Sequence, residues 1–173
     1  MQTLKMQLQN RLRGARRVAI VGIGSEIRGD DACGMLVAQE IQKHLALRQV
    51  RIKVFLGSTA PENLTGEIKK FRPTHIVMVD AAQIKKPRTQ ALLFTPEEID
   101  AISFCTHRLP LSVMAAYLKQ SFPCEVVCIG VQPRSIVFNK PISPEMKKRV
   151  TRVSDIIIEA LNICDKRKKE IYA

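Results

Sequence analysis

The sequence predicts an α/β fold, a three-layer α/β/α sandwich around a twisted, mostly parallel sheet of five strands. Two observations predict it. Short apolar runs alternate along the chain with longer segments of helical periodicity, and such alternation builds parallel βαβ units. The 173 residues, 46% of them hydrophobic and without internal repeats, suit one domain rather than two.

The first half of the chain supplies three strands and their helices. Residues 18–23 form an apolar run that is followed by a glycine, which is typical of a buried parallel strand. Residues 30–47 carry an apolar stripe at helical spacing. Residues 50–56 alternate as a half-buried strand does, and a short helix follows them. Residues 74–79 form a second apolar strand that ends at Asp80.

The second half continues the alternation. Residues 89–94 predict a weaker fourth strand, and Pro110 stands at the first position of a helix that runs to about residue 122. Residues 125–131 form the last core strand. Ser143, Pro144 and Glu145 combine an N-cap, a helix-start proline and an early acid, so we expect a final helix through residue 164.

Positive charge is concentrated at the ends of the chain. The net charge is +12, of which residues 1–17 carry +5 and residues 165–173 carry +2. We therefore divide the chain into a basic N-terminal extension (1–17), a single α/β domain (18–164) and a basic C-terminal tail (165–173). The first segment has leucines at four-residue spacing and could form a short amphipathic helix. Two solvated ends are the simpler interpretation, and attraction to nucleic acid, an anionic membrane or an acidic partner is the alternative.

Several classes of protein are excluded. Aromatic residues are not interleaved with the basic ones, so we expect no specific nucleic-acid binding. The apolar run at residues 18–23 is far shorter than the roughly 20 residues of a membrane span, and it does not have the features of a secretory signal.

Five cysteines without a C-x-x-C pair suggest free thiols in the cytoplasm. No apolar surface stripe is left over, so we expect a monomer.

Three polar groups follow predicted strands. They are Asp31 in the loop after the first strand, Asp80 after residues 74–79, and His107 before the helix that starts at Pro110. Ligands in such folds bind beyond the carboxyl ends of the strands, so the three side chains should converge. Two carboxylates and an imidazole could hold Ni, Zn, Mn or Fe and leave positions open for water or substrate.

Competing interpretations remain for these residues. Asp30 or Asp31 could simply cap the following helix, whereas Asp80 at the end of an apolar strand must find a partner or a metal. The glycines of the first loop do not match a dinucleotide-binding motif, and its acids would repel a phosphate. Cys105 lies two residues from His107, but neighbours in sequence seldom form a catalytic pair, so a thiol nucleophile is disfavoured.

Taken together, these motifs resemble the endopeptidases that mature [NiFe] hydrogenases, and among them the HycI type. The resemblance covers about residues 18–161 and depends on five stretches in the family's order. These are VGIGSEIRGDDACG (21–34), STAPEN (58–63), IVMVDA (76–81), THRLPL (106–111) and CIGVQP (128–133). Ser25 stands where the family usually has asparagine, which affects the geometry of the first loop.

The resemblance implies a phosphorylase/hydrolase-like fold and a reaction. The reaction is one cut that removes the C-terminal extension of the hydrogenase large-subunit precursor, after nickel has been inserted. The family's nickel-contacting residues fall on Asp31, Asp80 and His107, which would also be catalytic in an aspartic-type peptidase. The nickel would be supplied by the precursor.

We assign a further set of residues to loop geometry or substrate binding: Gly24, Ser25, Asp30 and Thr106. Two other functions remain open. One is a different hydrolase on the same fold, such as a peptidyl-tRNA hydrolase or an aminopeptidase. The other is a noncatalytic nickel-binding chaperone of hydrogenase assembly.

Overall fold

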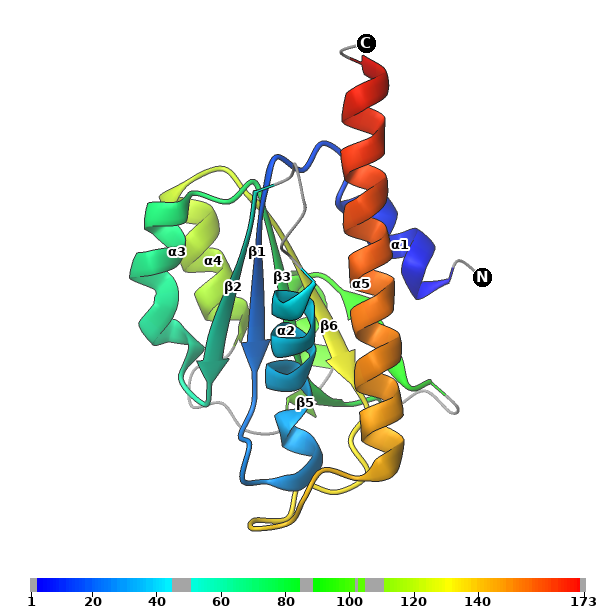
Figure 1. Ribbon diagram of the computed structural model, residues 1–173. Helices are drawn as coiled ribbons and strands as arrows, with labels where there is room; N and C mark the ends of the chain where they lie inside the picture. The colour runs from blue at the N-terminus through cyan, green and yellow to red at the C-terminus, as the bar shows by residue number, and fades with distance from the viewer. Residues whose placement is uncertain (1–2, 45–50, 85–88, 102, 105–110, 172–173) are drawn as a thin grey trace.

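The computed structural model describes residues 3–44, 51–84, 89–101, 103–104 and 111–171. Side chains are described for all of these except 99–101, 103–104 and 163–171. Helices cover both faces of a central sheet, which gives three layers (Figure 1). This arrangement confirms the predicted α/β/α sandwich.

The main sheet has the strand order β2-β1-β3-β6-β4. Its parallel members are β2 (Arg51–Ser58), β1 (Arg17–Ile23), β3 (His75–Gln83) and β6 (Glu125–Val131). The edge strand β4 (Ala91–Phe94) runs antiparallel to β6. A two-residue strand that the sequence did not predict, β5 (Ser103–Phe104), pairs antiparallel with the end of β3.

The helices divide between the two faces of the sheet (Figure 1). One face carries α1 (Leu4–Arg11), α2 (Cys33–Lys43) and α5 (Pro144–Ile171). The other carries α3 (Thr65–Phe71) and α4 (Leu111–Ser121). Short 3₁₀ turns complete the described part of the chain: η1 (Gly29–Ala32), η2 (Pro61–Leu64) and η3 (Pro96–Ala101). Within the described ranges, no helix is both long enough and apolar enough to cross a membrane.

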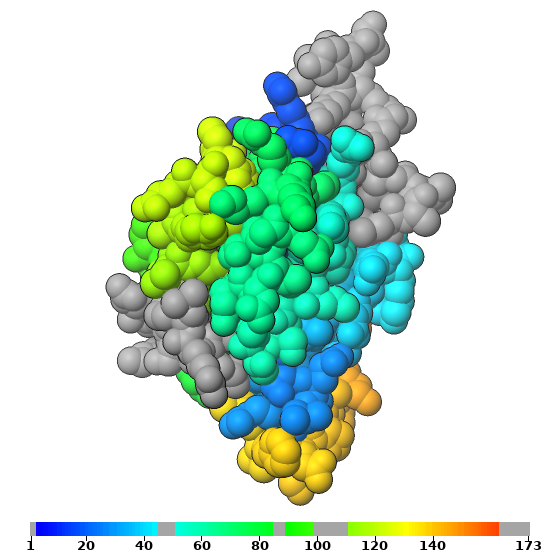
Figure 2. Space-filling model, turned by 90° about the vertical axis from the view of Figure 1, so that its left-hand side faces the viewer, coloured from blue at the N-terminus to red at the C-terminus, as the bar shows by residue number. Residues whose placement is uncertain are grey.

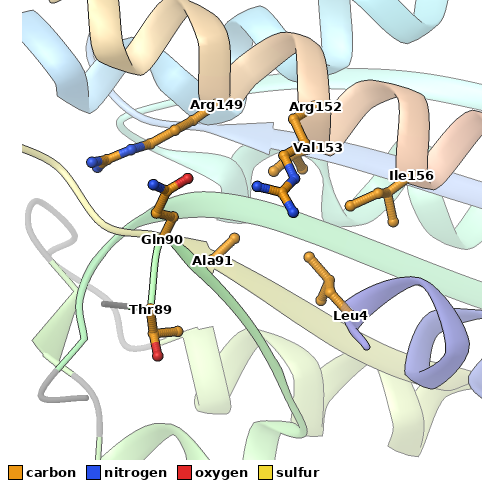
Figure 3. Close-up of a pocket in the computed structure, with 8 residues that line it drawn as sticks. All are labelled: Leu4, Thr89, Gln90, Ala91, Arg149, Arg152, Val153 and Ile156. Atoms are coloured by element: carbon orange, nitrogen blue, oxygen red, sulfur yellow. The ribbon is translucent and has the colours of Figure 1, made fainter. Parts of the chain in front are cut away.

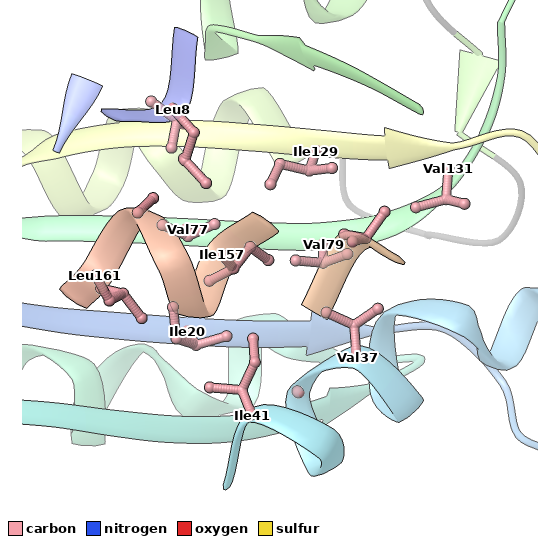
Figure 4. Packing of buried hydrophobic residues seen from close by; sticks show 14 of the residues in the cluster. Leu8, Ile20, Val37, Ile41, Val77, Val79, Ile129, Val131, Ile157 and Leu161 are labelled. Carbon is pink, nitrogen blue, oxygen red and sulfur yellow. The ribbon is translucent and has the colours of Figure 1, made fainter. Parts of the chain in front are cut away.

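Alternation along the central strands builds two cores. Val18 and Ile20 of β1 face α2 and α5, whereas Ala19 and Val21 face α3 and α4. Figure 4 shows the first core, where Ile20, Val77 and Ile129 from three strands pack beneath Ile157 of α5. Because both faces of the sheet are covered, the central strands are apolar throughout, as the sequence predicted.

Three elements differ from their predicted bounds. The second apolar strand continues through Asp80 to Gln83, so Asp80 lies inside β3 rather than after it. The first helix begins at Cys33 instead of residue 30, because Gly29–Ala32 forms the turn η1. The last helix continues to Ile171, and the residues expected to form a basic tail therefore extend α5.

The N-terminal segment belongs to the same core as the rest of the chain. Leu8 and Leu12 are completely buried among residues of α5 and the sheet, and Thr3 caps α1 by accepting from the N–H of Met6. Ion pairs of Lys5 with Glu159 and of Arg11 with Glu125 add links on the surface. The core thus begins well before residue 18, where the sequence analysis starts the domain.

Two glycines let α2 approach the carboxyl ends of β1 and β3. A Cβ atom on Gly34 would lie 2.1 Å from the carbonyl oxygen of Val79 and 2.3 Å from that of Ile23. A Cβ atom on Gly22 would lie 2.5 Å from the carbonyl oxygen of Gly34. The start of α2 is therefore held directly against β1, which precedes Asp31, and against β3, which contains Asp80.

We expect Gly34→Ala to lower the free energy of unfolding by about 1–3 kcal/mol, because backbone atoms rather than flexible side chains oppose the new methyl group. Gly66 in α3 is the matched control, since nothing lies within 4 Å of the position its Cβ would take. Gly66→Ala should be neutral or stabilise the fold by up to about 1 kcal/mol. Urea denaturation measures both, and equal effects would contradict the close approach of α2.

Candidate functional site

Two buried aspartates lie at the carboxyl edge of the sheet. Asp31 is in η1, directly after the loop that follows β1, and Asp80 is the sixth of the nine residues of β3. Their exposed fractions are 0% and 1%. Since β1 and β3 are parallel neighbours, both residues belong to the edge where ligands bind in such sheets.

The first loop is closed by short hydrogen bonds around Asp31. The N–H of Ser25 donates to Oδ2 of Asp31 over 2.7 Å, and the N–H of Gly24 donates to the carbonyl of Ser58 over 2.9 Å. Gly24 has a φ of +127°, and a Cβ atom there would lie 1.8 Å from the carbonyl oxygen of Asp31. Only glycine fits this position. Gly24 and Ser25 therefore fix where the Asp31 carboxylate lies.

Asp80 is held by its own strand. Its backbone pairs with Gly130 of β6, and its Oδ1 accepts from the N–H of Ala81 over 2.7 Å. A buried carboxylate at this place is costly unless polar partners compensate it. The strand continues past Asp80, so the carboxylate is fixed by regular sheet structure on both sides.

Three carboxylates act on the buried thiol of Cys33. Burial raises the pKa of this thiol well above its usual range, and the charges of Asp80, Asp31 and Asp30 raise it further, in that order. The three aspartates are therefore near enough to this buried thiol, at the start of α2, to act on its pKa. The thiol stays protonated and cannot serve as a nucleophile at neutral pH.

Asp30 joins two distant segments of the chain. Its Oδ2 accepts from the N–H of Arg134 at 2.8 Å, and its Oδ1 accepts from the N–H of Ser143 at the same distance. The hydroxyl of Ser143 and the N–H of Ser135 add longer bonds to Oδ2, at 3.1 and 3.4 Å. Burial acts to raise the pKa of Asp30, but these hydrogen bonds outweigh it and lower that pKa.

The helix-cap interpretation of the two aspartates was wrong. Ala32 is the N-cap residue of α2, and no side chain caps that helix. Asp30 instead supports the cap of α5, because Ser143, which donates to it, also accepts from the N–H of Met146. The sequence analysis recognised Ser143 as an N-cap, but nothing in the local sequence links it to a residue 113 positions away.

Part of the predicted site lies outside the described residues. This applies to Thr106 and His107, and to Cys105 of the thiol alternative. Within the described ranges, no three His, Cys, Asp or Glu side chains are grouped so that they could hold a metal ion. His75 lies at the opposite end of β3 from Asp80, and burial lowers its pKa. His44 is the C-cap of α2.

One cavity of about 270 Å³ lies on the α5 side of the sheet, away from the aspartates. Figure 3 shows it between Leu4 of α1, Ala91 of β4 and the side chains of Arg149, Arg152 and Ile156 of α5. Neither Asp31 nor Asp80 lines it. The candidate chemistry and this cavity are therefore separate features.

Comparison with known proteins identifies relatives over most of the chain. The family model described as "HycI: Hydrogenase maturation protease" matches residues 35–160. A putative hydrogenase maturation protease of Methanocaldococcus jannaschii is 32% identical over 91% of this chain and 96% of its own length. The Hydrogenase 3 maturation protease of Escherichia coli K12 is 30% identical over 76% of this chain and 82% of its own length.

A solved structure agrees with these sequence matches. The crystal structure of a [NiFe] hydrogenase maturation protease HycI from Thermococcus kodakarensis superposes with a TM-score of 0.81 at 31% identity. The match covers 90% of this chain and 99% of that protein. The similarity therefore extends over most of the fold described above.

We expect Asp30→Asn to lower the free energy of unfolding at pH 7 by about 2 kcal/mol, because an amide NH₂ would face backbone donors that now bind a carboxylate. The lowered pKa sets the pH dependence. The stabilisation is complete above the ordinary pKa of 3.8 and is lost as pH falls through the lower native value. Wild type and variant should therefore converge below pH 3.8. Asp155→Asn, an exposed aspartate of α5, is the control, and a constant difference at all pH values would contradict the prediction.

Proposed function

We propose a reaction for this chain from one premise: the chain belongs to the HycI family of hydrogenase maturation proteases. It is accordingly a hydrolase and an endopeptidase of hydrogenase maturation. The proposed reaction is a single cut that removes a C-terminal extension from the large-subunit precursor of a [NiFe] hydrogenase. The cut follows the insertion of nickel, and the nickel arrives with the precursor.

The observation that carries this proposal is the pair of buried carboxylates, Asp31 and Asp80, around the start of α2. Carboxylate oxygens are suitable ligands for a divalent cation, and a cation would compensate two buried negative charges at one edge of the sheet. Phosphate-bearing substrates would be repelled at the same place, which disfavours the peptidyl-tRNA hydrolase alternative.

The chain's own groups are prepared for a water-mediated cut. Backbone N–H groups orient both carboxylates before substrate binds. The N–H of Ser25 donates to Asp31, and the N–H of Ala81 donates to Asp80. Either carboxylate could accept a proton from the water whose oxygen adds to the scissile carbonyl carbon. The proton then passes to the leaving amine as the C–N bond breaks.

The nickel ion of the precursor would supply Lewis acidity and would orient the segment to be cut. Asp31, Asp80 and His107 are the proposed contacts to it, with His107 resting on the resemblance of the THRLPL stretch. A precursor without nickel would leave the two carboxylates without their cation, and the cut would not be made. The reaction thus checks that the metal is present.

The described thiols support a carboxylate mechanism of the aspartic type over a thiol mechanism. Burial raises the pKa of Cys124 to about 11 and raises the pKa values of Cys33 and Cys128 further from neutrality. All three are free cysteines. Free thiols suit a reducing compartment, and we propose that the reaction takes place in the cytoplasm.

Mass spectrometry of the precursor tests the reaction directly. The cognate large-subunit precursor is incubated with the enzyme in two samples, one loaded with nickel and one free of it. We expect one C-terminal truncation in the loaded sample and none in the other. A stable complex in which a verified nickel-loaded precursor keeps its full length would contradict the reaction and favour the chaperone alternative.

Replacing the proposed contacts should stop the cut without unfolding the protein. We expect Asp31→Asn, Asp80→Asn and His107→Ala each to lower the cleavage rate by about 10²–10⁴-fold, the usual contribution of a general acid or base. Asp155→Asn should leave the rate unchanged, because this exposed aspartate lies on α5. A variant that cuts at the wild-type rate would remove that residue from the mechanism.

A further inference from the structure

Three large apolar side chains are exposed together beside the candidate site. Ile27, Val137 and Phe138 have exposed fractions of 59%, 55% and 63%, and we call them the Phe138 patch. In Figure 2 the loop after β1 (blue) and the segment before α5 (yellow) meet at the lower end of the molecule. The sequence analysis expected no apolar surface to be left over, and this patch corrects it.

Backbone contacts bring the members of the patch together. The N–H of Asn139, next to Phe138, donates to the carbonyl of Ile27 over 2.7 Å. Arg28 and Lys140, the residues that follow on each side, form a parallel β-bridge. Ile27 therefore lies alongside Phe138, although the two are more than a hundred positions apart in the sequence.

The patch stands on a fixed base. The N–H of Gly29 donates to the carbonyl of Lys140 at 3.0 Å, and the N–H of Asp30 donates to that of Ser135 at 2.9 Å. The buried Asp30 carboxylate adds its own bonds to the same segment. The three apolar side chains are thus presented to water by ordered backbone. Burying each one against a partner would contribute about 1.5–3 kcal/mol.

Charged side chains border the patch. Arg28, Arg134 and Lys140 are all exposed and lie on the same two segments. The neighbouring acids are engaged within the chain, since Glu26 accepts from Gln39 and Glu145 pairs with Arg134. Arg134 is engaged with Glu145 in the same ion pair, so Arg28 and Lys140 are the basic residues of the border that complement an acidic rim on a partner.

The position of the patch identifies its occupant. Ile27 and Asp31 are four residues apart in one loop, so at most about 14 Å separates their Cα atoms. A protein whose peptide lies at the Asp31 and Asp80 carboxylates therefore comes within reach of the patch. Exposed aromatic and aliphatic side chains in such a place are typical of contact surfaces.

We propose that the Phe138 patch is the docking surface for the folded body of the protein that this enzyme cuts, through an apolar face with an acidic rim. This inference depends on the proposed function, because the docked protein is the hydrogenase large-subunit precursor. Docking at the patch holds the body of the precursor while its C-terminal segment extends to the carboxylates. The patch contributes to binding and takes no part in bond breaking.

Steady-state kinetics on the nickel-loaded precursor test the docking. We expect the double variant Ile27→Ser/Phe138→Ala to raise KM at least tenfold while kcat changes less than twofold, because the lost contact is the same in ground state and transition state. The matched control is Val113→Ser/Tyr117→Ala on α4, whose side chains are 48% and 46% exposed away from the patch. The control should leave both constants within twofold of wild type.

The possible outcomes distinguish a failure of the docking from a failure of the proposed reaction. An unchanged KM in the patch variant, with cutting intact, removes the patch but leaves the proposed reaction standing. A wild-type chain that binds nickel-free precursor through the patch, yet never cuts the loaded form, overturns the reaction and keeps the docking. Sedimentation that shows a wild-type dimer and a monomeric patch variant assigns the surface to a second copy of this chain instead.

The acidic rim has its own test. We expect Lys140→Glu to slow association with the precursor about threefold or more at low ionic strength and to have little effect at 0.5 M salt, where surface charges are screened. Lys70→Glu on α3 is the control for an equal change of net charge elsewhere. Equal effects of the two variants would overturn the acidic rim.

Discussion

The carboxylate of Asp30 is the constraint on which the loops at the carboxyl edge of the sheet depend. A single buried side chain accepts hydrogen bonds from Arg134, Ser135 and Ser143, and these residues belong to the segment that follows β6 and opens α5. Its neighbour Asp31 lies in η1, just before α2, and its carboxylate accepts a hydrogen bond from the N–H of Ser25 instead. The two adjacent aspartates therefore have different roles. Asp30 joins distant parts of the chain, and Asp31 lies at the carboxyl edge of the sheet. If the Asp30 carboxylate were lost, only backbone bonds would connect the loop that carries Asp31 to the segment that opens α5.

The continuous apolar strands could be predicted from the sequence nearly to the residue. Residues 125–131 were predicted as a strand and form β6, and residues 18–23 differ from β1 only by Arg17. Burial on both faces makes such strands conspicuous. The end of β3 was misplaced, because a charged residue was interpreted as the end of a strand, whereas Asp80 is buried within the sheet. The two-residue strand β5 is too short to show any periodicity.

Some features of the candidate site could likewise be predicted from the sequence, and others could not. Parallel strands place their carboxyl ends on one edge, so the proximity of Asp31 and Asp80 could be expected from topology. The bonds between Asp30 and Ser143 could not, because a residue's propensity carries no information about a partner 113 positions away. The exposure of Phe138 was equally hidden, since an apolar residue in a sequence gives no indication of whether it is buried. Only the assembled loops show which side chains remain in water.

The packing of α1 has a consequence for the order in which this chain can fold during synthesis. Leu8 and Leu12 are synthesised well before α5, yet they are buried against it. An isolated helix of eight residues is not stable in water, so α1 must wait for the rest of the chain. Until then β4 has no neighbour beyond β6, and its outer edge, which α1 later flanks, is open to other nascent chains. The packing of α1 beside β4 therefore depends on a helix that is made much later in the chain.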